Sequence, residues 1–117
     1  MREIKFRCWY DKRMHKVVDI DFSYKRINLL GADIISFEQG ILMQYTGLKD
    51  KNGKEIYEGD ILIYDEDEIA IVQYSEVDAM FEIILDNIVT NFSNESSEWW
   101  RIIGNIYDNP ELLKESE

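Results

Sequence analysis

The chain has few of the residues on which most catalytic and metal-binding sites depend. Its 117 residues include one cysteine (Cys8), one histidine (His15) and one proline (Pro110). A single cysteine excludes an internal disulfide, and a reducing compartment is the natural expectation. Structural zinc sites need about four ligands, which are mostly Cys and His, so this pair cannot build one. We therefore predict no catalytic residue, no metal ligand and no cofactor.

Glycine-rich motifs and long apolar runs are lacking as well. The six glycines are scattered singly and form none of the patterns that cradle phosphate. The first residues lack the apolar run of a signal peptide, and no stretch reaches the roughly 20 apolar residues of a membrane span. We expect a cytoplasmic protein that does not enter a membrane.

The composition is that of a folded domain with an uneven charge. The net charge is −11. Residues 1–31 carry eight Lys or Arg against four acids, whereas residues 55–117 carry seventeen acids against two bases. The acidic half disfavours binding to nucleic acid, and binding through the basic segment is a minor alternative. Either the two ends compensate each other, or the basic end of one copy meets the acidic half of another.

Alternating apolar residues near the N-terminus predict a hairpin. Residues 3–9 alternate with Cys8 on the apolar face, and a polar loop follows over 10–15. Residues 17–24 alternate more cleanly, while 27–40 are ambiguous between a bent strand and a helical turn. The apolar face expected for 17–24 consists of Val18, Ile20, Phe22 and Tyr24.

Short apolar strands at regular spacing fill the rest of the chain. The expected strands cover 41–46, 61–64, 69–74, 80–85, 88–92 and 98–107. Asn52-Gly53 is the strongest turn dipeptide, because both residues tolerate positive φ. This spacing is typical of a small barrel or sandwich. We predict a mainly β fold: an N-terminal hairpin subdomain over 1–40, then a small SH3-like β-barrel subdomain with a short C-terminal helix over 41–117.

The C-terminal helix is predicted from its first residues. Asn109 suits the N-cap, Pro110 suits the first helical position, and Glu111 favours the positive end of the helix dipole. A helix this short should be marginal unless Leu112 and Leu113 pack against the barrel.

Trp99 and Trp100 are the best candidates for an interface. Neighbours in a strand point to opposite faces, so one ring can fill the core while the other faces solvent or another chain. Aromatic side chains are enriched where proteins meet. Alternatively, Leu112 and Leu113 could pack over the second ring, and this would account for it equally well.

The abundant carboxylates match no catalytic or calcium-binding pattern. Residues 65–68 are all acidic but lack the alternating ligands and central glycine of a calcium loop, so a solvated loop is expected. Asp60 should accept backbone N–H bonds in the turn that contains Gly59. Cys8, on an apolar strand face, should behave as a small hydrophobe and not as a nucleophile.

The run from Met43 to Ile61, MQYTGLKDKNGKEIYEGDI, resembles the central signature of the YopX-like family of phage and prophage proteins. The segment 2–7 followed by Trp9 resembles that family's opening, and 103–113 resembles its close. Tyr10 departs from the pattern, which has an aspartate directly after the tryptophan. The resemblance implies a phage-borne, mainly β protein with no assigned activity, and an architectural frame over 43–61 and 102–113. The signature residues of this frame are Gly47, Asn52, Gly53, Tyr57, Gly59, Asp60, Gly104, Asn109 and Pro110.

The leading hypothesis is a non-catalytic module that self-assembles into a homo-oligomer or binds a host or phage protein. One alternative is an acidic decoy that imitates DNA and occupies a nucleic-acid-binding protein. A second is an enzyme with a carboxylate-based site, which would require a concave pocket holding acids with perturbed ionisation.

Overall fold

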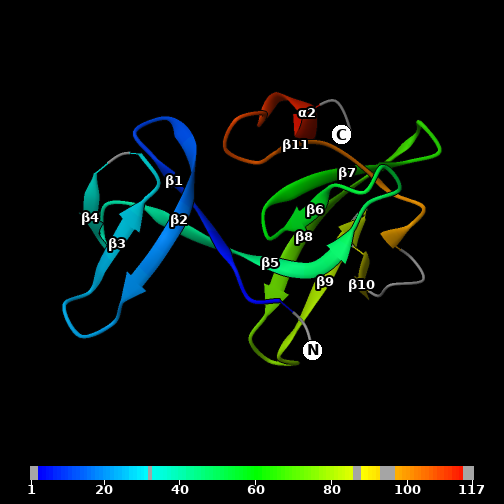
Figure 1. Cartoon of the computed structure of the whole chain (residues 1–117). Coiled ribbons are helices and arrows are strands. Elements are labelled where there is room, and N and C mark those ends of the chain that lie inside the picture. Colours follow the sequence, from blue (N-terminus) through cyan, green and yellow to red (C-terminus); the bar gives the residue numbers. More distant parts are fainter. Residues whose placement is uncertain (1–2, 32, 86–87, 93–96, 115–117) are drawn as a thin grey trace. The chain divides into compact units, whose positions relative to one another are not determined.

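The computed structural model describes residues 3–31, 33–85, 88–92 and 97–114, and their structure is mainly β, as predicted (Figure 1). The elements are β1 (Phe6–Tyr10), β2 (Arg13–Asp21), β3 (Arg26–Leu29), β4 (Ile34–Ser36), β5 (Ile41–Lys49), β6 (Glu55–Tyr57), β7 (Asp60–Tyr64), β8 (Glu68–Ser75), β9 (Met80–Leu85), β10 (Ile88–Asn91), β11 (Arg101–Asn105) and α2 (Glu111–Lys114). Among these elements, no helix is long and apolar enough to cross a membrane.

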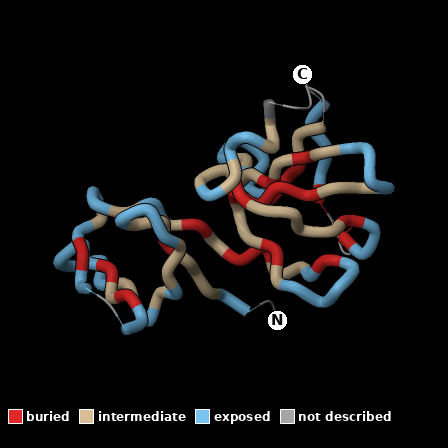
Figure 2. Tube along the Cα trace, turned by 90° about the horizontal axis from the view of Figure 1, so that it is seen from above, coloured by how far each residue is buried: buried red, intermediate tan, exposed pale blue. Residues whose placement is uncertain are grey.

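The chain divides into two compact units, the N-terminal unit over residues 1–45 and the C-terminal unit over 46–117. The division falls inside β5, whereas the sequence placed it at the start of that strand. The first half of β5 pairs with β1 in the N-terminal unit. Its second half belongs to the C-terminal unit, where β6 is its neighbour in the sheet. Both units contain buried positions (Figure 2).

β1 and β2 form an antiparallel hairpin with a two-residue turn. Asp11 and Lys12 both have positive φ, 52° and 63°, as a type I′ turn requires. The twist of such a turn matches that of the strands, so β1 and β2 stay paired up to the turn. In this register Cys8 and His15 lie directly opposite each other. The predicted polar loop over 10–15 is therefore too long.

A bulge in β2 breaks the alternation that the sequence predicts for 17–24. The register of β2 against β3 shifts between Val17 and Asp19, which leaves an extra residue in β2. Val17 packs against the core of the N-terminal unit, and Val18 is exposed. The single apolar face expected for Val18, Ile20, Phe22 and Tyr24 is therefore wrong.

The segment after β2 is a turn and not a continuation of the strand. The Asp21 Oδ1 accepts the backbone N–H groups of Ser23 (2.9 Å) and Tyr24 (3.1 Å), as in an Asx turn. Phe22 extends from this turn, and its ring makes a T-shaped contact with the Phe37 ring, at 5.9 Å between centroids.

The ambiguous segment 27–40 forms two short strands that complete the N-terminal core. These two strands, β3 and β4, belong to a six-stranded sheet with the order β4-β3-β2-β1-β5-β6. Gly40 lets the chain pass close to this core, because an added Cβ would lie 2.5 Å from the Cys8 Sγ. The buried residues of the core are Cys8, Ile27, Leu29 and Ile35.

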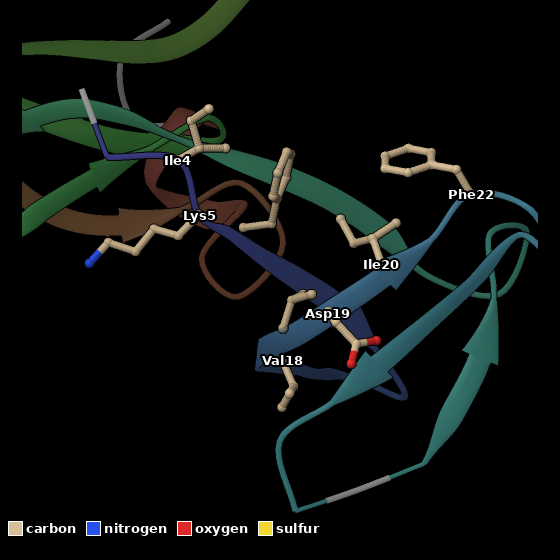
Figure 3. Close-up of a pocket in the computed structure, with 8 residues that line it drawn as sticks. Ile4, Lys5, Val18, Asp19, Ile20 and Phe22 are labelled. Atoms are coloured by element: carbon tan, nitrogen blue, oxygen red, sulfur yellow. The ribbon is translucent and has the colours of Figure 1, made fainter. Parts of the chain in front are cut away.

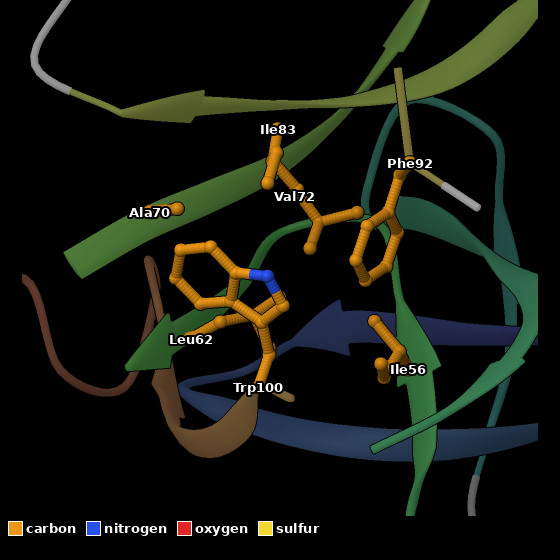
Figure 4. Packing of buried hydrophobic residues seen from close by; sticks show 7 residues of the cluster. All are labelled: Ile56, Leu62, Ala70, Val72, Ile83, Phe92 and Trp100. Carbon is orange, nitrogen blue, oxygen red and sulfur yellow. The ribbon is translucent and has the colours of Figure 1, made fainter. Parts of the chain in front are cut away.

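The C-terminal unit contains a five-stranded antiparallel sheet in the order β10-β9-β8-β7-β11. β7 lies inside the sheet, as its apolar sequence predicts. Among the described residues, β10 and β11 end this sheet, so no closed barrel is found and the SH3-like barrel stays a prediction. Its core, drawn in Figure 4, consists of Ile56, Leu62, Ala70, Val72, Ile83, Phe92 and Trp100.

The last strand is shorter than predicted. β11 begins at Arg101, so both tryptophans precede it. A helix follows, as predicted, and α2 has four residues. The Leu112 and Leu113 side chains are partly buried.

Candidate functional site

A groove of about 280 Å³ opens on the N-terminal unit (Figure 3). β1 and β2 pair only from Tyr10 with Arg13 to Arg7 with Lys16. Beyond that pair β1 continues beside β5 and β2 continues beside β3, so the two strands diverge. The groove lies at this divergence and is lined by Ile4, Lys5, Phe6, Val17, Val18, Asp19, Ile20 and Phe22.

The lining exposes large apolar side chains to solvent. Ile4 is 70% exposed, Val18 56% and Phe22 73%. Ile20 and Phe22 project toward the same side of the ribbon, with Ile4 facing them across the groove (Figure 3). Several large apolar side chains gathered at one hollow are typical of an interaction surface. The sequence assigned Ile4, Val18, Ile20 and Phe22 to apolar strand faces, and alternation could not reveal the bulge beside Val18.

Two charged residues belong to the groove lining, Lys5 and Asp19. The Lys5 ammonium lies 3.3 Å from the Glu3 carboxylate and 5.1 Å from the centroid of the Tyr45 ring. An exposed ion pair of this kind contributes about 0–1 kcal/mol, so Lys5 can exchange Glu3 for the carboxylate of a partner at little cost. The groove can therefore take an apolar side chain with an acid beside it.

Asp50 organises the frame of the C-terminal unit, although the sequence did not single it out. Its Oδ1 accepts the N–H groups of Asn52 and Lys54, both at 2.9 Å, and its Oδ2 accepts that of Ile102 at 3.0 Å. One buried carboxylate thus joins the β5–β6 turn to β11, across 52 residues of sequence. An aspartate two residues before Asn-Gly is a turn signal that could have identified it.

The structure places the predicted glycines and Asn52 in turns and strand irregularities. Gly47 and Gly53 have φ of 86° and 83°. Asn52 does not share the positive φ that its dipeptide suggested; the Gly53 N–H donates to the Asp50 carbonyl oxygen at 3.0 Å, in a turn with glycine last.

Tyr57, Gly59 and Asp60 lie together at the turn between β6 and β7. The Asp60 Oδ2 accepts the Tyr57 N–H at 2.7 Å. Gly59 has φ of 90°, donates its N–H to Val72 and accepts the N–H of Ile106 at 3.0 Å. This turn is therefore tied to β8 and to the residues after β11.

Asn105 and Asn109 fix the chain between β11 and α2. The Asn105 Oδ1 accepts the N–H groups of Tyr107 and Asp108. The Asn109 Oδ1 accepts the Asn105 N–H at 3.3 Å, so this side chain is turned back toward β11 and away from its predicted N-cap role. Gly104 leaves room for it, since an added Cβ would lie 2.4 Å from that oxygen. The Pro110 carbonyl accepts the Leu113 N–H.

The two tryptophans have different environments. Trp100 is buried in the core of the C-terminal unit, whereas Trp99 is 63% exposed. Tyr64 contacts both rings, with centroid distances of 6.3 Å to Trp99 and 5.6 Å to Trp100. Trp99 is therefore the tryptophan that another chain could reach, and its place at an interface stays a prediction.

Cys8 and His15 lie opposite each other on β1 and β2. The sequence did not predict this pairing, because His15 was assigned to a loop. The Cys8 side chain is buried and its Sγ lies 3.8 Å from the Trp9 carbonyl oxygen. The His15 Nε2 lies 3.0 Å from the Tyr10 carbonyl oxygen. Burial raises the pKa of the Cys8 thiol above its ordinary value of 9.0. A neutral buried thiol is a poor nucleophile.

This raised pKa predicts a loss of stability in alkaline solution. Above pH 9 the thiol ionises in the unfolded chain before it does so in the folded one, so the folded state binds more protons and stability falls as pH rises. Urea unfolding of wild type and Cys8→Ala should therefore differ by a constant amount below about pH 8. Above pH 9 wild type should lose stability relative to the variant. A constant difference up to pH 10.5 would contradict the assignment.

Residues 65–67 of the acidic segment form a tight turn between β7 and β8, and Glu68 is already the first residue of β8. Asp65 and Glu66 both have positive φ, 53° and 60°, and the Asp67 N–H donates to the Tyr64 carbonyl oxygen. The Glu66 carboxylate pairs with Arg101 at 2.9 Å. Within the described part of the chain, no group of three or more His, Cys, Asp or Glu side chains could hold a metal ion.

Comparison with known proteins agrees with this fold. The family model described as YopX protein matches residues 5–114. The crystal structure of protein EF1440 from Enterococcus faecalis has 31% sequence identity and a TM-score of 0.69; the match covers 97% of this chain and 99% of that chain. No curated protein matches the sequence.

Proposed function

The chain belongs to the YopX family, and we propose that it is a non-catalytic protein-interaction module, encoded by a phage or prophage and acting in the cytoplasm of the bacterial host. The observation that carries this proposal is the groove of the N-terminal unit, with Ile4, Val18 and Phe22 exposed around it. Exposing such side chains costs free energy in water, and burying them against a partner recovers it.

The size and lining of the groove favour a protein segment over a small molecule. Its volume of about 280 Å³ lies just below the range of roughly 300–1,000 Å³ that is usual for small-molecule sites. Such sites also need several polar groups that converge on the ligand. Here the charged groups are Lys5 and Asp19, and the other lining residues are apolar.

The charge of the N-terminal unit favours an acidic partner. Residues 1–45 carry eight bases against six acids, a net charge of +2, and the groove lining holds Lys5 together with Asp19. The partner segment we propose presents one apolar side chain to the groove and carries carboxylates on either side of it. Electrostatic complementarity of this kind raises the rate of association and selects the partner.

A non-catalytic role is supported by the state of the residues that could do chemistry. Cys8 is buried, and its thiol has a raised pKa. His15 lies against a backbone carbonyl group. The acidic decoy and the carboxylate-based enzyme stay predictions.

A titration followed by NMR tests the proposed binding. The probe is the acetylated peptide Asp-Glu-Val-Leu-Glu-Asp, and its control carries Lys at the four acidic positions. The acidic peptide should shift backbone amide signals of residues 4–6 and 17–22 at millimolar concentration. Phe22→Asp should weaken this binding by about tenfold or more, because it adds charge and removes apolar contact.

Tyr24→Asp is the matched control. Tyr24 is 74% exposed and follows Phe22 in the same turn, but it does not line the groove. It should bind the acidic peptide like wild type. Equal binding of the acidic and the lysine peptide, or signal changes confined to residues outside the groove, would refute the proposal.

A further inference from the structure

We propose that the groove binds the β8–β9 turn of a second copy of this chain, with the side chain of Val77 inserted. This inference rests on the proposed function, since it names the partner that the groove accepts. It makes the assembly head to tail, with the N-terminal unit of one copy contacting the C-terminal unit of the next.

The β8–β9 turn presents an apolar side chain to solvent. Val77 is 94% exposed, the highest value among the large apolar side chains of the described residues. It lies between Glu76 and Asp78, so a carboxylate stands on each side of it. This is the pattern of one apolar residue with flanking acids that the groove favours.

The turn holds Val77 in a fixed conformation. Ser75 and Met80 form the last pair of the β8–β9 ladder. The Ser75 Oγ accepts the Asp78 N–H at 3.1 Å, and Ala79 completes the turn with φ of 54°. A preorganised turn loses little conformational entropy on docking, which favours binding.

Charge complementarity favours a second copy as the partner. Residues 46–117 carry eighteen acids against five bases, a net charge of −13, whereas residues 1–45 have a net charge of +2. Two copies that meet through their C-terminal units would juxtapose like charges, with a net charge of −13 on each side. A head-to-tail contact instead brings the net charge of −13 on residues 46–117 to the net charge of +2 on residues 1–45, and the groove lining itself holds one base and one acid, Lys5 and Asp19.

The contact uses two different surfaces, so it is heterologous. Such contacts build closed rings or open filaments, depending on the rotation between copies. One turn in one groove buries little area, and interfaces below about 1,200 Å² are usually weak and transient. Association should therefore be visible from about 10 μM to 1 mM and should weaken at high salt.

Complementary variants test the inference by sedimentation velocity. Phe22→Asp removes the groove but keeps the turn, and Val77→Asp removes the turn but keeps the groove. Each variant alone should associate about tenfold or more weakly than wild type, and it should be monomeric at concentrations where wild type associates. An equimolar mixture should form a one-to-one dimer and nothing larger, because each pair retains one intact groove and one intact turn.

Two matched variants serve as controls. Tyr24→Asp lies outside the groove in the N-terminal unit, and Val89→Asp changes an exposed valine of the C-terminal unit. Both should associate like wild type. Lys5→Glu should weaken assembly, and adding Glu76→Lys and Asp78→Lys to the same chain should restore it.

Several results would overturn the inference. They are a wild type that stays monomeric up to 1 mM, a Val77→Asp variant that still associates, and a mixture that stays monomeric. A dimer built from two facing grooves would survive Val77→Asp. If wild type is monomeric but the acidic peptide still binds in a Phe22-dependent way, the second copy is wrong as partner and the proposed function stands.

Discussion

Asp50→Ala should lower the free energy of unfolding by about 3–5 kcal/mol. The buried carboxylate accepts three backbone N–H groups, from Asn52, Lys54 and Ile102. Alanine offers no acceptor, and a buried donor left without one costs about 1–3 kcal/mol. The loss should be large because the same side chain holds both a turn and the strand β11 in place.

Urea unfolding followed by circular dichroism measures this effect. Asp50→Asn keeps one acceptor oxygen and should lie between alanine and wild type. Asp67→Ala removes an exposed acid and should stay within about 0.5 kcal/mol of wild type. The assignment fails if Asp50→Ala unfolds within 1 kcal/mol of wild type.

Trp100→Ala should destabilise the protein by about 3–5 kcal/mol, whereas Trp99→Ala should cost less than about 1 kcal/mol. Trp100 packs among the buried residues of the C-terminal core, so its removal loses apolar burial and leaves a cavity (Figure 4). Trp99 is largely exposed and contacts Tyr64, so little burial is lost with it.

The comparison needs both variants under the same unfolding conditions, with Trp100→Phe as a milder variant that retains an aromatic ring. Trp100→Phe should fall between wild type and Trp100→Ala. Equal losses for Trp99→Ala and Trp100→Ala would contradict the different environments of the two rings. If Trp99→Ala were strongly destabilised and Trp100→Ala were not, Trp99 and not Trp100 would be the buried ring.

Local sequence signals carried much of the fold. The strands β7, β8, β9 and β10 follow apolar segments that the sequence identifies, because side-chain alternation and turn residues act over a few positions. The frame over 43–61 and 102–113 was visible as a signature, yet Asp50 was missed. Its partner Ile102 is distant in sequence, and a hydrogen bond between distant segments leaves no local pattern.

By itself, the sequence determined that this is a mainly β chain with few reactive side chains and an acidic C-terminal half. Only the tertiary structure decided that a bulge shifts β2, that Ile4 and Phe22 line a groove, and that Trp100 and not Trp99 is buried. The physical reason is that composition and alternation are properties of neighbouring residues. The divergence of two strands and the burial of one ring depend instead on which distant segments pack together.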